Sequence, residues 1–228
     1  MAPHAIVSYD DTSSDHDALM LGRIFRDVGA SLTLAYVRHA THQRLDHEQL
    51  SQREAEQLLE RGARWLDDRY VERRVVVSPS TGQGLGWLAA EESGDVIVFG
   101  SDYRTPRGRV AIGRSAHTLL EGGPAALALA PAGYAAMLEP PVATIGVLPG
   151  TADEAAIETA FSLAGRLDAR VVDSERGVDL LVVGSRREAR EGRVMITSNA
   201  HNAIEQATAP VLVVARGVAL RFESLVTV

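Results

Sequence analysis

One seven-residue segment of this chain occurs twice in closely similar form. Residues 95–101 read Asp-Val-Ile-Val-Phe-Gly-Ser, and residues 179–185, 84 positions later, read Asp-Leu-Leu-Val-Val-Gly-Ser. A short apolar run that follows an acidic residue and ends in glycine is typical of a buried strand in a parallel sheet. The repetition predicts a fold that is built twice.

Strand and helix signals alternate around the first copy. The predicted strands are 5–9, 32–37, 75–77, 96–100 and 125–130, and the predicted helices are 13–29, 48–68, 85–92 and 115–120. Ser13 or Ser14 is expected to cap the first helix, because small hydroxyl residues favour that position. This order predicts an α/β fold with a doubly wound, parallel five-stranded sheet and helices on both faces.

The pattern then restarts in shortened form. Strands at 144–148 and 211–215 and a helix at 154–167 correspond to elements of the first unit. The offset between the copies falls from 138 residues at the first strand to 84 at the repeated segment, so about 54 residues are missing. They correspond to the long helix, the third strand and the short helix, which can lie at one edge of such a sheet. We expect domains at 1–131 and 143–228, joined by a linker at 132–142.

Two segments of the second unit have no obvious place. Only a few residues separate residues 170–172 from the next strand, and a parallel crossover needs about a dozen or more. We therefore expect this segment to be antiparallel, irregular or outside the sheet. Residues 220–228 are expected to form an extra strand.

Composition excludes several chemistries. The chain has 228 residues and no Cys, and all 23 of its basic residues are Arg. Disulfides, thiolate nucleophiles and lysine-based phosphate loops are thereby excluded. The net charge of −7 argues against a nucleic-acid partner. No apolar run suggests a membrane span, and the N-terminus lacks a signal-peptide pattern, so we expect a cytoplasmic protein.

Two strand ends carry candidate ligand-binding residues. Asp10 follows the first strand, and Gly100 and Ser101 follow the fourth, at the edge where parallel α/β sheets bind ligands. The loop from Ser101 to Ser115 leads into a helix start, whose free N–H groups suit a phosphate. Four arginines in this loop could add phosphate contacts: Arg104, Arg107, Arg109 and Arg114. Other interpretations remain open, because Asp10 can simply cap a helix, the glycines can permit a tight loop, and the arginines can be solvated.

The spacing of these residues resembles the universal stress protein family in a tandem form. Nucleotide-binding members carry Gly, two residues, Gly, nine residues, Gly and then Ser or Thr. Gly100 and Gly113 match the outer glycines, Tyr103 replaces the middle one, and Arg114 takes the hydroxyl position with Ser115 next. The resemblance implies that Asp10 and the backbone of Val37 lie beside the adenosine part of ATP or a related adenine nucleotide, with Mg²⁺ possible.

The second copy departs further from this pattern. Gly184 and Ser185 are retained, but Arg187, Thr197 and Pro149 replace the middle glycine, the last glycine and the aspartate. We interpret this half as a structural pseudo-repeat. Family members commonly dimerise through the last strand, so the chain is expected to form a homodimer or an intrachain pseudo-dimer in which 127–130 pairs with 211–214.

The sequence thus favours a stress-response or regulatory module that binds an adenine nucleotide, rather than a metabolic enzyme. The alternative is a nucleotide-free member that acts by association. Slow ATP hydrolysis would have only Asp10 and Asp11 as candidate bases. No metal site is predicted, because His39, His42 and His47 lack partners at ligand spacing.

Overall fold

The structure, a computed structural model, describes residues 2–39, 45–137, 141–151 and 153–222. Its first half contains five parallel strands in the order β3-β2-β1-β4-β5. The strands are β1 (His4–Ser8), β2 (Ser31–His39), β3 (Glu72–Ser78), β4 (Val96–Gly100) and β5 (Ala126–Ala130). The helices are α1 (Ser13–Asp27), α2 (Leu45–Trp65), α3 (Thr81–Glu91) and α4 (Arg114–Leu120). The predicted doubly wound parallel sheet is confirmed.

The second half has four strands and two helices among the described residues. They are β6 (Thr144–Val147), α5 (Glu154–Leu167), β7 (Arg170–Val172), β8 (Leu180–Gly184), α6 (Ser198–Gln206) and β9 (Val211–Val214). The order β9-β8-β6-β7 has the same form as β5-β4-β1-β2. No described strand corresponds to β3, so the missing residues lie at a sheet edge.

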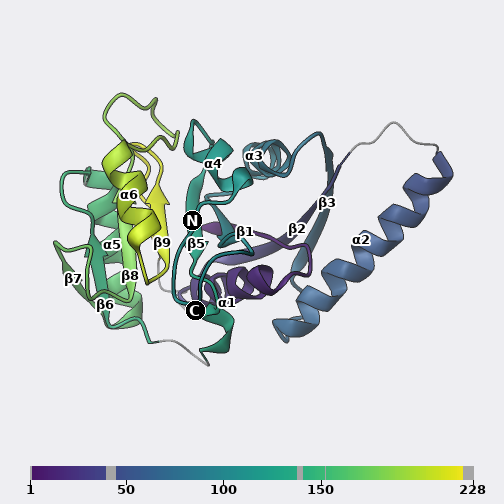
Figure 1. Ribbon diagram of the computed structural model, residues 1–228, viewed down its shortest axis with the longest axis horizontal. Helices are drawn as coiled ribbons and strands as arrows, with labels where there is room; N and C mark the ends of the chain where they lie inside the picture. Colours follow the sequence, from purple (N-terminus) through teal and green to yellow (C-terminus); the bar gives the residue numbers. More distant parts are fainter. Residues whose placement is uncertain (1, 40–44, 138–140, 152, 223–228) are drawn as a thin grey trace, which may run out of the picture.

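Strands β5 and β9 join the two halves into one sheet (Figure 1). They run antiparallel, with Leu127 opposite Val213 and Leu129 opposite Val211. The predicted pairing of these two segments is confirmed. The division into domains at 132–142 stays a prediction, because the strands of both halves form a single sheet.

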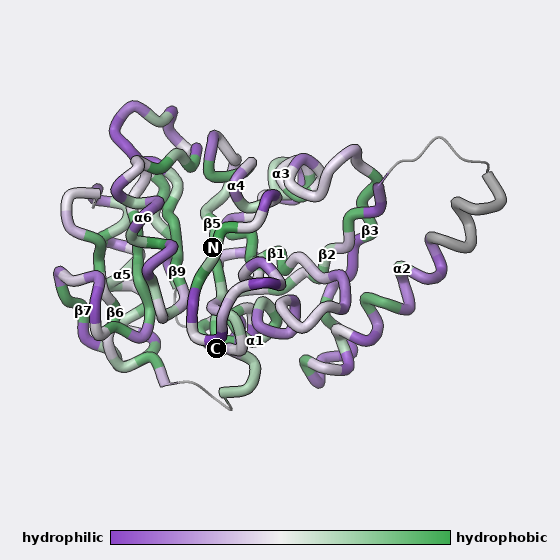
Figure 2. The backbone as a smooth tube through the Cα atoms, viewed as in Figure 1, coloured by the Kyte–Doolittle hydropathy of each residue, from purple (hydrophilic) through white to green (hydrophobic). Residues whose placement is uncertain are grey.

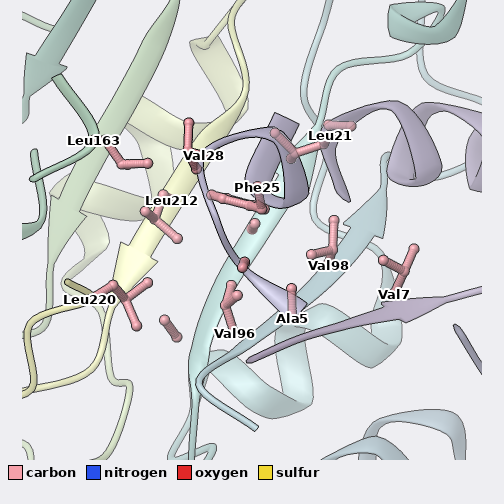
Figure 3. Close-up of a cluster of buried hydrophobic side chains, with 14 of the residues drawn as sticks. Ala5, Val7, Leu21, Phe25, Val28, Val96, Val98, Leu163, Leu212 and Leu220 are labelled. Atoms are coloured by element: carbon pink, nitrogen blue, oxygen red, sulfur yellow. The ribbon is translucent and has the colours of Figure 1, made fainter. Parts of the chain in front are cut away.

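Two apolar layers cover the sheet, one on each face. The first layer involves α1, α2 and α5, and the second involves α3, α4 and α6. Figure 2 shows the hydrophobic residues of the strands and, along the described part of α2, an alternation of hydrophilic and hydrophobic residues. Figure 3 shows that the first layer crosses the junction, since Phe25 and Val28 of the first half lie near Leu163, Leu212 and Leu220 of the second. The halves therefore share a core as well as a sheet.

The expectation for residues 170–172 was wrong, because β7 pairs parallel with β6. The connection from β7 to β8 spans only residues 173–179, and both strands flank β6. Gly146 makes this short path possible: a Cβ there would lie 2.2 Å from the Ser174 carbonyl oxygen and 2.8 Å from Val178 Cγ1. The connection crosses directly over β6 where that strand has no side chain. Because β7 is only three residues long, little chain is needed to return to the start of β8.

The start of α1 differs from the prediction, and the predicted linker makes contacts that the sequence did not indicate. Thr12, rather than Ser13 or Ser14, is the N-cap of α1, and the Asp15 carboxylate accepts hydrogen bonds from its N–H and hydroxyl. Within the predicted linker, the buried Asp17 carboxylate accepts hydrogen bonds from the Gly133 and Ala135 N–H groups at 2.8 and 2.7 Å. This carboxylate fixes the segment against α1.

The described part of the C-terminal segment is not a strand. The Leu220 and Phe222 N–H groups donate to Thr159 Oγ1 and Ser162 Oγ on α5, and the Phe222 ring stacks on Phe25 with centroids 6.0 Å apart. Side-chain hydroxyls of α5 thus take the place of a neighbouring strand. Residues 223–228 of the predicted strand lie outside the described residues. No helix in the described ranges is both long enough and apolar enough to cross a membrane.

Candidate functional site

A cavity of about 340 Å³ lies at the carboxyl ends of β1, β2 and β4. Seven of the eight predicted site residues line it: Asp10, Val37, Gly100, Ser101, Gly113, Arg114 and Ser115. They come from segments up to about a hundred residues apart, so the fold brings the predicted positions together. Neighbouring parallel strands end at this edge, and the chain reverses its direction of winding there, which opens a crevice.

Arg104 is the predicted residue that does not line the cavity. Its guanidinium lies 5.0 Å from the centre of the Tyr103 ring, a cation–π distance. The Tyr103 ring itself borders the cavity but is 70% exposed. Tyrosine at the middle-glycine position therefore forms part of the rim and does not fill the space.

Gly113 differs from Gly100 in what surrounds its α-carbon. A Cβ at Gly113 would meet nothing within 4 Å, and its φ of −69° is open to any residue. A Cβ at Gly100 would lie 1.8 Å from the Ser14 carbonyl oxygen. Packing of α1 on β4 therefore requires glycine at Gly100, whereas at Gly113 the missing side chain leaves open space at the cavity.

The Ser101 hydroxyl makes its hydrogen bonds with backbone groups of the protein. It donates to the Ala130 carbonyl oxygen at 2.7 Å and accepts from the Ala111 N–H at 3.1 Å, and the residue is buried. The same contacts recur in the second half, where Ser185 donates to Val214 and accepts from Met195. The recurrence in a half that lacks the glycine motif indicates a structural role for this serine.

Asp10 lies at the mouth of the cavity with an altered acidity. Reduced hydration raises the pKa of its carboxyl, and the negative charge of Asp15 raises the pKa further, while His39 opposes the shift. A carboxylate whose hydration is reduced is stabilised by hydrogen-bond donors.

The loop of Asp10 is held in a strained form by its neighbours. Asp11 has a φ of 58°, in the left-handed region that non-glycine residues seldom occupy. Its carboxylate accepts hydrogen bonds from Tyr9 Oη at 2.7 Å and from Arg61 Nε of α2 at 2.6 Å. These bonds lower the pKa of Asp11 and tie α2 to the cavity edge.

The lining residues that sequence reasoning did not name as site residues include His39, Tyr36 and Thr81. His39 Nε2 lies 3.1 Å from Thr81 Oγ1, so β2 and α3 form one wall together. The alternation of side chains along β2 places Val37 and His39 on the same face, which is a signal that could have found His39. His42 and His47 lie outside the residues whose side chains are described.

Two arginines of the loop serve contacts within the protein. Arg109 Nη1 donates to the Gln206 carbonyl oxygen at 3.0 Å, in the second half. Arg193, 84 positions later, donates to the Gly122 carbonyl oxygen at 3.4 Å, in the first half. Arg107 packs beside Gly133, where a Cβ would lie 2.9 Å from its Nε. Neither Arg107 nor Arg109 lines the cavity.

Metal-ligating groups do not gather in the part of the chain that the structure describes. No set of three or more His, Cys, Asp or Glu side chains is arranged there to hold an ion.

The fold and the cavity define a class of α/β proteins with a ligand crevice at the carboxyl edge of a parallel sheet. Residues 171–215 match the Universal stress protein family. This segment runs from β7 to the end of β9, in the second half of the chain. No curated protein sequence matches the chain.

Solved structures extend the likeness to nearly the whole chain. A universal stress protein from Archaeoglobus fulgidus has a TM-score of 0.71 at 14% identity, covering 94% of this chain and 98% of that one. A putative universal stress protein from Pseudomonas aeruginosa has a TM-score of 0.62 at 15% identity, covering 93% of each chain. This protein thus has the universal stress protein fold and carries the family's sequence pattern in residues 171–215.

Proposed function

We propose that this protein is a regulatory module of the stress-response type that binds an adenine nucleotide in the cavity beside Asp10. The observation that carries the proposal is the convergence of Asp10, Val37, Gly113, Arg114 and Ser115 on one cavity. The base would lie beside Val37 and His39, and the ribose hydroxyls would donate to Asp10. The phosphates would lie against Arg114, the Ser115 hydroxyl and the open space at Gly113.

The acid–base groups favour binding over catalysis. Hydrogen bonds from Tyr9 and Arg61 lower the pKa of Asp11, which makes it a poor general base. Asp10 is the other carboxylate that the sequence offered for ATP hydrolysis, and in the proposed complex it would hold the ribose. We therefore propose a binding protein, with ATP and Mg²⁺ as the first pair to test.

Isothermal titration of the full chain with ATP and Mg²⁺ tests the proposal. Arg114→Ala should weaken binding about 10-fold, the usual effect of removing a charge-assisted contact to phosphate. Arg176→Ala is the matched control, because its side chain is 86% exposed and pairs only weakly with Glu175. No heat and no thermal shift at millimolar nucleotide would overturn the proposal.

The β5–β9 pairing bears on the second candidate function, association without nucleotide, because it determines which sheet edge is already used within the chain. The strand edges through which two such subunits could pair are already joined inside the chain. We propose that the chain is its own pseudo-dimer and that this edge does not recruit a second copy. Light scattering should then give the mass of one chain, 24.4 kDa. A mass of two chains would show that another surface drives a homodimer.

A further inference from the structure

A second cavity, of about 630 Å³, lies between α4 and α6 on the face of the sheet opposite α1, and we call it the groove. It is larger than the cavity beside Asp10, and it shares no lining residue with it. Its volume is within the range of small-molecule sites, about 300–1,000 Å³. Both halves of the chain contribute, with His117 and Leu120 from α4 and His201 from α6.

The walls of this groove are fixed by hydrogen bonds. The Arg186 N–H donates to the Met195 carbonyl oxygen at 2.7 Å, and the Val194 N–H donates to the Gly123 carbonyl oxygen of the first half at 3.0 Å. Glu121 and Met195 form an antiparallel bridge across the junction. The groove is therefore formed before any ligand arrives, which lowers the cost of ordering it.

Two histidines related by the internal repeat meet in the groove. His117 and His201 lie 84 positions apart, and their ring centroids are 6.2 Å apart in an edge-to-face arrangement. Each has a glutamate one helical turn away, with His117 Nδ1 3.8 Å from Glu121 and His201 Nδ1 3.8 Å from Glu205. The two imidazoles offer flat, partly polar surfaces to a ligand.

The repeat also shows where the groove is asymmetric. Arg186 lines it, and the residue 84 positions earlier is Asp102, of opposite charge. No carboxylate pairs with Arg186 among the described residues, and its guanidinium remains available to an anion. The hydroxyl of Ser198 and the amide of Asn202 line the same groove and have no hydrogen-bond partner in the described ranges.

We propose that this groove binds a small organic anion carried on a flat apolar body. The anionic group pairs with Arg186 and accepts hydrogen bonds from Ser198 and Asn202. The body lies against Leu120, Met195 and the two imidazoles. Because the groove is built from both halves across the β5–β9 junction, this site depends on the joined sheet and not on the nucleotide cavity.

Phenyl phosphate is a suitable probe, followed through the histidine ring protons in NMR. The resonances of His117, His201 and His39 can be assigned from single His→Gln variants. Saturable shifts of His117 and His201, without a shift of His39, are expected, because His39 belongs to the other cavity. A shift of His39 alone would overturn this proposal while supporting an anion site beside Asp10.

Two further comparisons test whether Arg186 and the charged group of the probe determine the binding. Arg186→Ala should weaken the binding about 10-fold, while Arg187→Ala, an exposed neighbour that does not line the groove, should leave it within about 2-fold. Phenol should bind at least about 10-fold more weakly than phenyl phosphate, because it lacks the charged group. Equal losses in the two arginine variants, equal binding of phenol, or no saturable shift at about 10 mM probe would overturn the proposal.

Discussion

Arg109 donates a hydrogen bond from Nη1 to the carbonyl oxygen of Gln206, 97 residues later, at 3.0 Å. The adjacent Val110 N–H donates to the Ala207 carbonyl oxygen at 3.1 Å. The internal repeat mirrors both bonds, with Arg193 on Gly122 and Val194 on Gly123. This pair of loops therefore connects the two halves outside the sheet.

Arg109→Ala should lower the free energy of unfolding by about 0.5–1.5 kcal/mol, the usual net value of one hydrogen bond. Nucleotide affinity should be unchanged, because Arg109 does not line the cavity beside Asp10. Urea unfolding and titration with ATP measure the two quantities. A loss of affinity with unchanged stability would instead place Arg109 on the phosphates.

Asp10→Asn should stabilise the protein and weaken nucleotide binding. The raised pKa means that the folded state binds this proton more tightly than the unfolded state does. The contribution of Asp10 to the free energy of unfolding therefore falls as the pH rises from its ordinary pKa through its raised folded pKa. Asparagine removes that loss, so the stabilisation should be larger at neutral pH than near the ordinary carboxyl pKa. Urea unfolding at both pH values checks the sign, and equal stabilisation at both would contradict it.

Gly146→Ala should destabilise the protein by about 1–3 kcal/mol, because the added methyl would overlap the backbone of the connection between β7 and β8. Gly165→Ala is the control, because this glycine lies in the exposed part of α5 and its new methyl group would meet no atom within 4 Å. It should stabilise the helix by about 0.5–1 kcal/mol. Urea unfolding of both variants gives the comparison, and similar effects would argue against the crossing at Gly146.

Asp17→Ala should cost about 2–4 kcal/mol, because two N–H groups would lose a buried, charged acceptor. The segment that begins at Gly133 should then separate more easily from α1. Limited proteolysis should cut near Tyr134 faster in the variant than in the parent chain. Unchanged proteolysis would show that the burial of Tyr134 alone holds the segment.

The strand and helix order could be predicted from the sequence because it depends on local periodicity. The parallel placement of β7 could not, since it depends on a contact between Gly146 and a connection 28 residues later. A glycine inside a strand pattern indicates that another part of the chain packs closely against it, but the sequence does not show which part.

The candidate site likewise combines positions that the local sequence order predicts with contacts that it does not predict. Strand ends predicted that Asp10 and Gly100 lie at the same edge of the sheet, because parallel strands end together, and both line the cavity. Val37 and Gly113 were named from the family resemblance, and they line the same cavity. Arg109 was grouped with phosphate contacts from its place in the loop alone. The residue 84 positions later, Arg193, is also an arginine and lies in the half that lacks the glycine motif, so the repeat gave a reason to doubt a role tied to that motif.

The unequal lengths of the two halves have a consequence for how the protein would respond to a ligand. Two identical subunits offer two identical sites, whose occupancies can influence each other. Here the shorter half has, among the described residues, no counterpart of β3 or of the wall that α3 forms, so the proposed nucleotide site occurs once. Its saturation should follow a simple hyperbola, with a graded response over about a hundredfold range of ligand concentration.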